Sequence, residues 1–99
     1  MSTRHLRNVS ISKLESFLEL CLCKYIKNKK GHIQYTRADL TRPLPFQNHI
    51  DPVPEFIVKN LLRGLGYSKN DFHDILELKK EVIRKGNKFL LQAVVKKNK

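Results

Sequence analysis

The sequence lacks tryptophan, has only two cysteines and contains no long apolar run. No run approaches the ~20 apolar residues that span a bilayer, and the first residues lack the apolar stretch of a secretory signal. These absences predict an intracellular protein without a membrane anchor. Cys21 and Cys23 lie two residues apart in a helical pattern, which points their side chains about 200° apart. We therefore expect reduced cysteines that pack in the interior and neither bridge nor bind metal.

Motifs for catalysis and for metal binding are also missing. The sequence has no Gly-rich phosphate loop, no nucleophile elbow and no separated carboxylate pair. Its histidines are scattered, and none has a second ligand at a chelating interval. We therefore expect a protein that is not an enzyme and has no cofactor and no metal site. The four histidines are His5, His32, His49 and His73.

Acidic residues are scarce, with 9 against 20 lysines and arginines, and the formal net charge is +11. A chain of 99 residues cannot bury so many charges, so its surface must carry them, and a polyanion is the expected partner. The 40% of hydrophobic residues suffices for one core. We expect a single domain with a flexible basic arm at residues 1–11, a folded core at 12–95 and a basic tail at 96–99.

Apolar residues early in the chain recur every three or four positions, and this period predicts a helix over residues 13–28. Ser12 and Glu15 have the spacing of a capping box at its start, and Gly31 is suited to its end. Leu20 and Cys23 lie off the main apolar face. A homodimer formed through this helix is therefore left open.

Prolines interrupt regular structure between residues 32 and 52. There we expect a short strand at 33–35, a single helical turn at 36–42 and a loop at 44–51. Asp51 is then expected to cap a helix over residues 54–63. The side chains predicted to point inward from this helix are Phe56, Ile57, Leu61 and Leu62, and those predicted to point outward are Lys59 and Arg63.

The last third of the chain has two clearer patterns. Ser68 and Asp71 have the spacing of a capping box and open a predicted helix that runs through Leu78. The runs 81–85 and 88–95 are rich in β-forming residues and are separated by one glycine and one asparagine. This pair suits the tight turn of a two-residue β-hairpin loop.

Residues 54–95 thus have the order helix, glycine turn, helix and β-hairpin, which resembles the winged helix-turn-helix superfamily. The segment Leu65-Gly66-Tyr67-Ser68 looks like the turn of that motif, and residues 82–89 correspond to its wing. The resemblance implies an α+β fold that is mainly helical with a C-terminal β-hairpin, and a DNA-binding or regulatory role. A different α+β arrangement of the same elements is the alternative.

The second helix of this motif departs from DNA-reading members because it is acidic. Residues 70–78 carry −3, whereas residues 1–30 carry +5 and residues 79–99 carry +7. Carboxylates facing a phosphate-lined groove would repel it, so the wing is the expected contact. The candidate nucleic-acid-binding residues are Arg84, Lys85, Asn87 and Lys88 at the wing tip, Lys79 and Lys80 at its base, Arg4 and Arg7 in the arm, Lys27, Lys29 and Lys30 at the end of the first helix, and Lys69 and Asn70 at the start of the acidic helix.

The leading hypothesis from the sequence is a small nucleic-acid-binding factor, with duplex DNA favoured over structured RNA. One alternative is a small basic structural component of a ribonucleoprotein such as the ribosome. Another is a protein-interaction module that uses the acidic helix against a basic partner.

Overall fold

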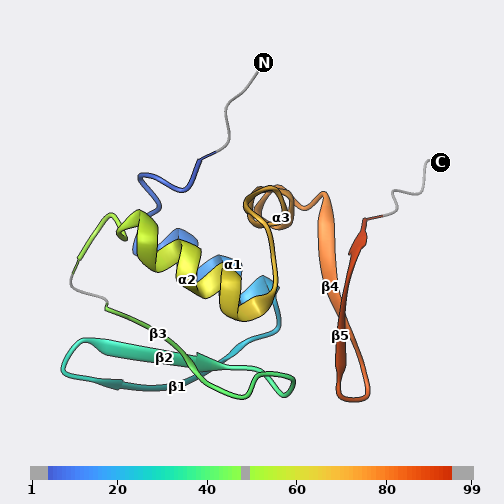
Figure 1. The fold of residues 1–99 in the computed structure, drawn as a ribbon, viewed down its shortest axis with the longest axis horizontal. Coiled ribbons are helices and arrows are strands. Elements are labelled where there is room, and N and C mark those ends of the chain that lie inside the picture. The colour runs from blue at the N-terminus through green and yellow to red at the C-terminus, as the bar shows by residue number, and fades with distance from the viewer. Residues whose placement is uncertain (1–4, 48–49, 95–99) are drawn as a thin grey trace.

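The computed structural model describes residues 5–47 and 50–94, apart from the side chain of Lys29 (Figure 1). These described residues form three helices and five strands. In order, they are α1 (Ile11–Leu20), β1 (Lys24–Lys29), β2 (His32–Thr36), β3 (Leu44–Gln47), α2 (Glu55–Leu65), α3 (Lys69–Leu76), β4 (Lys80–Lys85) and β5 (Lys88–Ala93).

The predicted mainly helical winged helix-turn-helix fold is wrong. The described residues do form an α+β fold, but only 33% of them are helical, and they contain two antiparallel sheets. One sheet has the strand order β1-β2-β3 and precedes α2, and the other is the β4–β5 hairpin. The first sheet was not predicted, because two of its strands lie in segments expected to be helix and loop.

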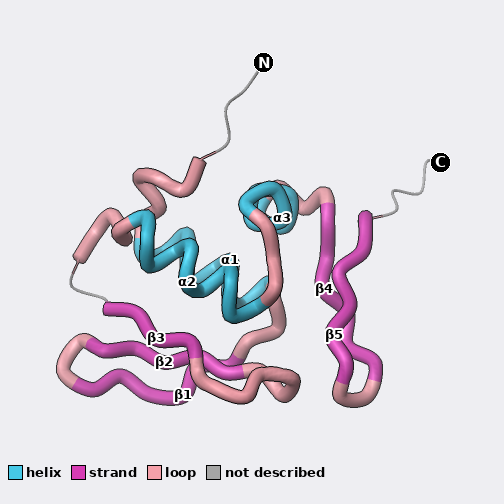
Figure 2. The backbone as a smooth tube through the Cα atoms, viewed as in Figure 1, coloured by secondary structure: helices cyan, strands magenta, loops and turns pink. Residues whose placement is uncertain are grey.

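Helices α1 and α2 lie over one face of the three-stranded sheet, and the core fills the space between these layers (Figures 1 and 2). Ile33 and Tyr35 of β2 and Phe46 of β3 are buried toward the helices. Gly64 permits the close contact of α2 with β3, since a Cβ atom there would lie 2.9 Å from Cδ2 of Leu44. The other face of the sheet carries no helix in the described chain.

The helix predicted over residues 13–28 begins earlier and is shorter, since α1 has 10 residues and its N-cap is Ser10, not Ser12. Helix α1 ends at Leu20, Leu22 adopts a left-handed conformation with φ of 66°, and the chain continues as β1. Strand β1 pairs with β2, so that Tyr25 lies opposite Tyr35. This pairing with the next strand of the chain overrides the helical period, which continues past Leu20 by coincidence.

Residues 36–51 also differ from the expectation. The strand predicted at 33–35 is confirmed as β2, but the helical turn predicted at 36–42 is absent and the predicted loop at 44–51 begins with β3. Pro45 lies within β3 opposite Gln34. A proline is tolerated there because β3 is an edge strand, where one side of the backbone needs no hydrogen-bond donor.

The two helices of the C-terminal half begin differently. Pro54, not Asp51, is the N-cap of α2, and Oδ1 of Asp51 instead accepts a hydrogen bond from the backbone N–H of Ile11 (3.3 Å). Phe56 was expected inside but is 63% exposed. The capping box of Ser68 at the start of α3 is confirmed, although α3 ends at Leu76.

The arm expected at residues 1–11 is packed from Leu6 onward. Leu6 and Val9 are both buried, and Val9 forms a β-bridge with Val53. Apolar side chains at these two positions anchor the segment, although the charges nearby had indicated a mobile arm. The predicted tail at 96–99 lies outside the described residues.

Both cysteines are buried and free, as expected for packing residues. They do not share a helix, because Cys21 is the C-cap of α1 and Cys23 immediately precedes β1. Burial raises the pKa of Cys23 to about 11 and raises that of Cys21 further. Both thiols therefore stay protonated near neutral pH.

Among the described residues, Arg37 is a charged residue that is buried in the core, with 4% of its surface exposed. Its Nη1 donates hydrogen bonds to the carbonyl of Cys21 (3.0 Å) and to the hydroxyl of Tyr67 (2.9 Å), and its Nε and Nη2 donate to the carboxylate of Asp39 (2.7 and 2.9 Å). The Arg37 hydrogen bonds hold the pKa of Asp39 below its usual value. The guanidinium also lies 4.5 Å from the ring centre of Phe89 in β5. Arg37 therefore ties the first sheet and the C-terminal hairpin to the same core.

Candidate nucleic-acid interface

The predicted C-terminal hairpin is confirmed, and its tip is basic. Strands β4 and β5 pair from Lys80 opposite Ala93 to Lys85 opposite Lys88. Gly86 has φ of 64°, which the first central residue of a type II′ turn requires. Lys85, Asn87 and Lys88 are exposed at this tip, and the hairpin extends beside the rest of the molecule (Figure 1).

Arg84 is held in place beside this tip. Its Nε donates a hydrogen bond to the carbonyl of Gly86 (2.7 Å), and its guanidinium lies 5.2 Å from the ring centre of Phe89. The side chain is nevertheless exposed, so its other N–H groups can meet solvent or a ligand. We call Arg84, Lys85 and Lys88 the hairpin-tip surface.

The base of the hairpin does not offer the cations that the sequence predicted. Nζ of Lys80 lies 2.8 Å from Oδ1 of Asp71 and 3.6 Å from Oδ2 of Asp74, and Nζ of Lys79 lies 3.2 Å from Oε1 of Glu77. These ion pairs neutralise Lys79 and Lys80 locally. The acidic side of α3 therefore helps to hold the hairpin against the core.

The contact between Lys80 and Asp71 also affects the carboxyl group. Burial disfavours the charged form of Asp71, but hydrogen bonds from Lys80 and from Ser68 outweigh it, and the pKa of Asp71 is lowered. Asp71 thus serves two elements, since it completes the capping box of α3 and binds the first residue of β4.

Replacing Lys80 with methionine should loosen the hairpin, because Asp71 and Asp74 would lose their shared cation while the apolar stem of the side chain is kept. We expect faster amide hydrogen exchange in β4 and β5, with exchange in α1 and β2 unchanged. Lys79→Met is the matched control, since its ion pair with Glu77 is exposed and should contribute little. Equal exchange in the two variants would contradict this role for Lys80.

A second basic region lies on the β1–β2 hairpin, where the sequence predicted the end of a helix. Lys27 is in β1 and Lys30 is in the turn that follows. Lys24 lies opposite Thr36 and Lys27 opposite Gln34, whereas the alternate residues of β2 are buried. These lysines therefore line the sheet face that no described helix covers.

Strand β2 adds polar groups to this face. Lys27, Lys30, His32 and Gln34 together line a shallow hollow with a volume of about 260 Å³. None of β1, β2 and β3 contains an acidic residue. We call Lys24, Lys27, Lys30 and His32 the sheet surface. Lys24, His32 and Gln34 were not among the predicted binding residues, although the alternation of polar and apolar residues in β2 could have identified the latter two.

The remaining predicted residues are spread over the molecule. Arg7 is exposed before α1, and Lys69 and Asn70 are exposed at the first turn of α3. The backbone of Lys29 pairs with His32 at the end of β1, and Arg4 lies outside the described residues. The tips of the two hairpins lie on different sides of the molecule (Figure 1). The described residues therefore form two separate basic surfaces, whereas the sequence predicted that the wing, the arm and the end of the first helix act together.

A metal site and a membrane-spanning helix are both absent from the described residues. Within residues 5–47 and 50–94, no group of three potential ligand side chains could hold a metal ion. In the same part of the chain, no helix has the length and apolar character needed to cross a bilayer. Comparisons of the sequence and structure with protein-family models, with curated proteins and with solved structures give no match.

Proposed function

We propose that this protein binds structured RNA by contacting phosphates through the hairpin-tip surface and the sheet surface. The observation that carries the proposal is the distribution of charge. The carboxylates at the base of the C-terminal hairpin, including Glu81 of β4, are engaged by Lys79, Lys80 or Gln92. The cations of the hairpin-tip surface and the lysines of the sheet surface are exposed. Exposed cations without nearby carboxylates attract a polyanion and release its counterions on binding.

Two features favour RNA over duplex DNA. The sequence-based preference for DNA depended on a helix that enters the major groove, but in α3 the carboxylates of Asp71 and Asp74 engage Lys80. Double-stranded RNA is recognised by its shape, through phosphates and 2′-hydroxyl groups across a wide, shallow minor groove. The lysines of the sheet surface supply donors to phosphates, and Gln34 can both donate to and accept from a hydroxyl.

Titration of a duplex RNA and a duplex DNA of the same sequence, at several salt concentrations, tests this proposal. We expect tighter binding to RNA. If the six cations of the two surfaces each neutralise a phosphate, the logarithm of the association constant should fall with the logarithm of salt with a slope of about −5. Tighter binding to DNA would support the DNA alternative, and no binding to either duplex would refute nucleic-acid binding altogether.

The separation of the two surfaces favours a second candidate within the same chemistry. A small basic protein with cations at two separated hairpins can contact two RNA segments at once, which suits a structural component of a ribonucleoprotein. A protein that bridges RNA in this way should bind two short duplexes at saturation. A one-to-one stoichiometry would argue against this role.

A further inference from the structure

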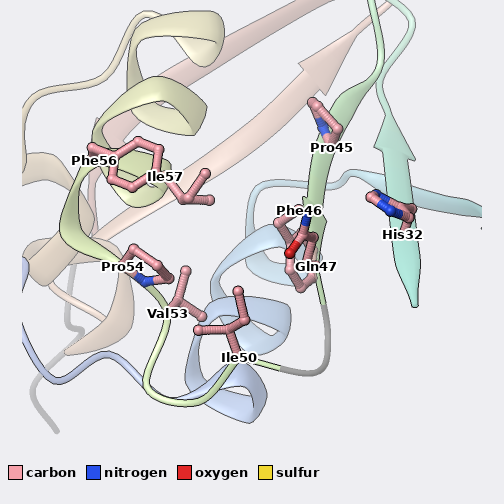
Figure 3. Close-up of a pocket in the computed structure, with 9 residues that line it drawn as sticks. All are labelled: His32, Pro45, Phe46, Gln47, Ile50, Val53, Pro54, Phe56 and Ile57. Atoms are coloured by element: carbon pink, nitrogen blue, oxygen red, sulfur yellow. The ribbon is translucent and has the colours of Figure 1, made fainter. Parts of the chain in front are cut away.

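An apolar groove lies next to the sheet surface, between the start of α2 and the end of β3 (Figure 3). Its volume is about 260 Å³. Ile57 of α2 and Ile50 and Val53 of the preceding segment lie across the groove from Pro45 and Phe46 of β3 (Figure 3).

Two large apolar side chains of this groove are exposed to solvent. Phe56 is 63% exposed and Ile50 is 42% exposed. Exposed apolar side chains beside a cavity are typical of a binding site for a ligand or a partner molecule. Two polar side chains, His32 and Gln47, belong to the lining, and both come from the sheet.

We infer that this groove receives an unstacked nucleobase of a bound RNA. The inference depends on the RNA binding proposed above. The observation that supports the inference most directly is that His32 lines both the groove and the hollow formed with Lys27 and Lys30. A nucleotide whose phosphate meets these lysines therefore has an apolar groove within reach of its base.

The chemistry of the groove suits a base better than it suits a charged or extended ligand. Unpaired bases in RNA loops and bulges are splayed out, stacked on aromatic rings and hydrogen-bonded along their edges. The exposed ring of Phe56 offers a stacking surface, and the amide of Gln47 offers both a donor and an acceptor for a base edge. The volume lies just below the ~300–1,000 Å³ of pockets for drug-sized ligands, so it fits one planar ring system.

The test compares an RNA duplex that contains one bulged adenosine with the fully paired duplex of the same length. We expect the protein to bind the bulged RNA about tenfold more tightly. In the Phe56→Ala variant this preference should disappear, while the affinity for the paired duplex stays unchanged. Folding is not expected to suffer, because the Phe56 side chain is mostly exposed and alanine favours a helix.

Two further variants sharpen the test. Leu78→Ala removes another exposed apolar side chain, one that lies outside the groove at 60% exposure, and should keep the bulge preference. Gln47→Ala should keep tighter binding to bulged RNA but reduce the difference between a bulged adenosine and a bulged uridine.

The outcomes separate this inference from the proposed function. Salt-dependent binding of paired RNA without any preference for the bulge would overturn the base site alone. Absence of binding to both RNAs would overturn both. If Phe56→Ala converts a dimer to a monomer in sedimentation measurements, the occupant of the groove is a second copy of the chain and the base site is refuted.

Discussion

Reversing the charge of Lys85 and Lys88 to glutamate is expected to weaken RNA binding by about tenfold or more at moderate salt. Both side chains are exposed and opposite one another at the turn of the β4–β5 hairpin. The change removes two phosphate contacts and introduces repulsion where each had been. The magnitude of the salt slope should fall by about 2, because each lost contact removes ~0.9. Filter binding or fluorescence anisotropy at three salt concentrations measures both quantities.

The same double reversal at Lys27 and Lys30 tests the sheet surface and should have a comparable effect. Lys13→Glu with Lys59→Glu is the matched control, because these exposed residues of α1 and α2 lie on helices over the opposite face of the sheet. All three double variants change the net charge by the same amount. An equal loss of affinity in the control would mean that RNA responds to overall charge and not to the two surfaces.

Replacing Arg37 with methionine is expected to lower the free energy of unfolding by about 3 kcal/mol. Methionine keeps much of the side-chain volume but leaves the carbonyl of Cys21 and the hydroxyl of Tyr67 without their donor, and Asp39 without its cation. The stacking of the guanidinium on Phe89 is lost as well. Buried polar groups that lose a partner cost more than the bond itself contributed.

Urea denaturation and thermal melting measure this change. For a domain of this size the expected loss corresponds to a decrease in Tm of roughly 12–24 °C. Arg63→Met is the control, because Arg63 is exposed on α2, and its variant should stay within about 0.5 kcal/mol of the unchanged protein. An effect of Arg37→Met no larger than that of Arg63→Met would show that the Arg37 contacts do not stabilise the fold.

The elements that local sequence could specify were predicted correctly. Gly86 and Asn87 between two β-rich runs identified the β4–β5 hairpin, and the Ser68 capping box identified the start of α3. In both cases the determining residues lie within a few positions of one another, so the hydrogen bonds that they form do not depend on contacts with distant parts of the chain.

The first sheet could not be predicted in this way. Strand β1 follows α1 with apolar residues that continue a helical period, and β3 contains a proline that argues against a strand. Pairing with β2 decides their conformation. Lys30 and Gly31, with positive φ angles, form the turn between β1 and β2, whereas the sequence pattern had indicated the end of a helix there. The sheet surface was missed for the same reason, because Lys27 and His32 come together only when the strands pair.

For the C-terminal hairpin the positions of the residues were predicted correctly, but the ion pairs of its lysines were not. Lys79 and Lys80 do lie at the base of the hairpin, but carboxylates of the preceding helix neutralise them. The prediction treated the net charge of −3 in residues 70–78 and the net charge of +7 in residues 79–99 as independent of each other. The fold brings these segments into contact and leaves the exposed charge at the tip.

Strand β1 lies at the rim of its sheet, with β2 on one side only. An open strand edge can add a strand from another molecule and start aggregation, and lysines along it counter this because two like-charged edges repel each other. Lys24 and Lys27 are therefore suited to keep separate copies of the protein apart in solution. A polyanion bound along β1 would cancel that repulsion, so under the proposed function the balance between nucleic acid and protein would also govern how readily the copies self-associate.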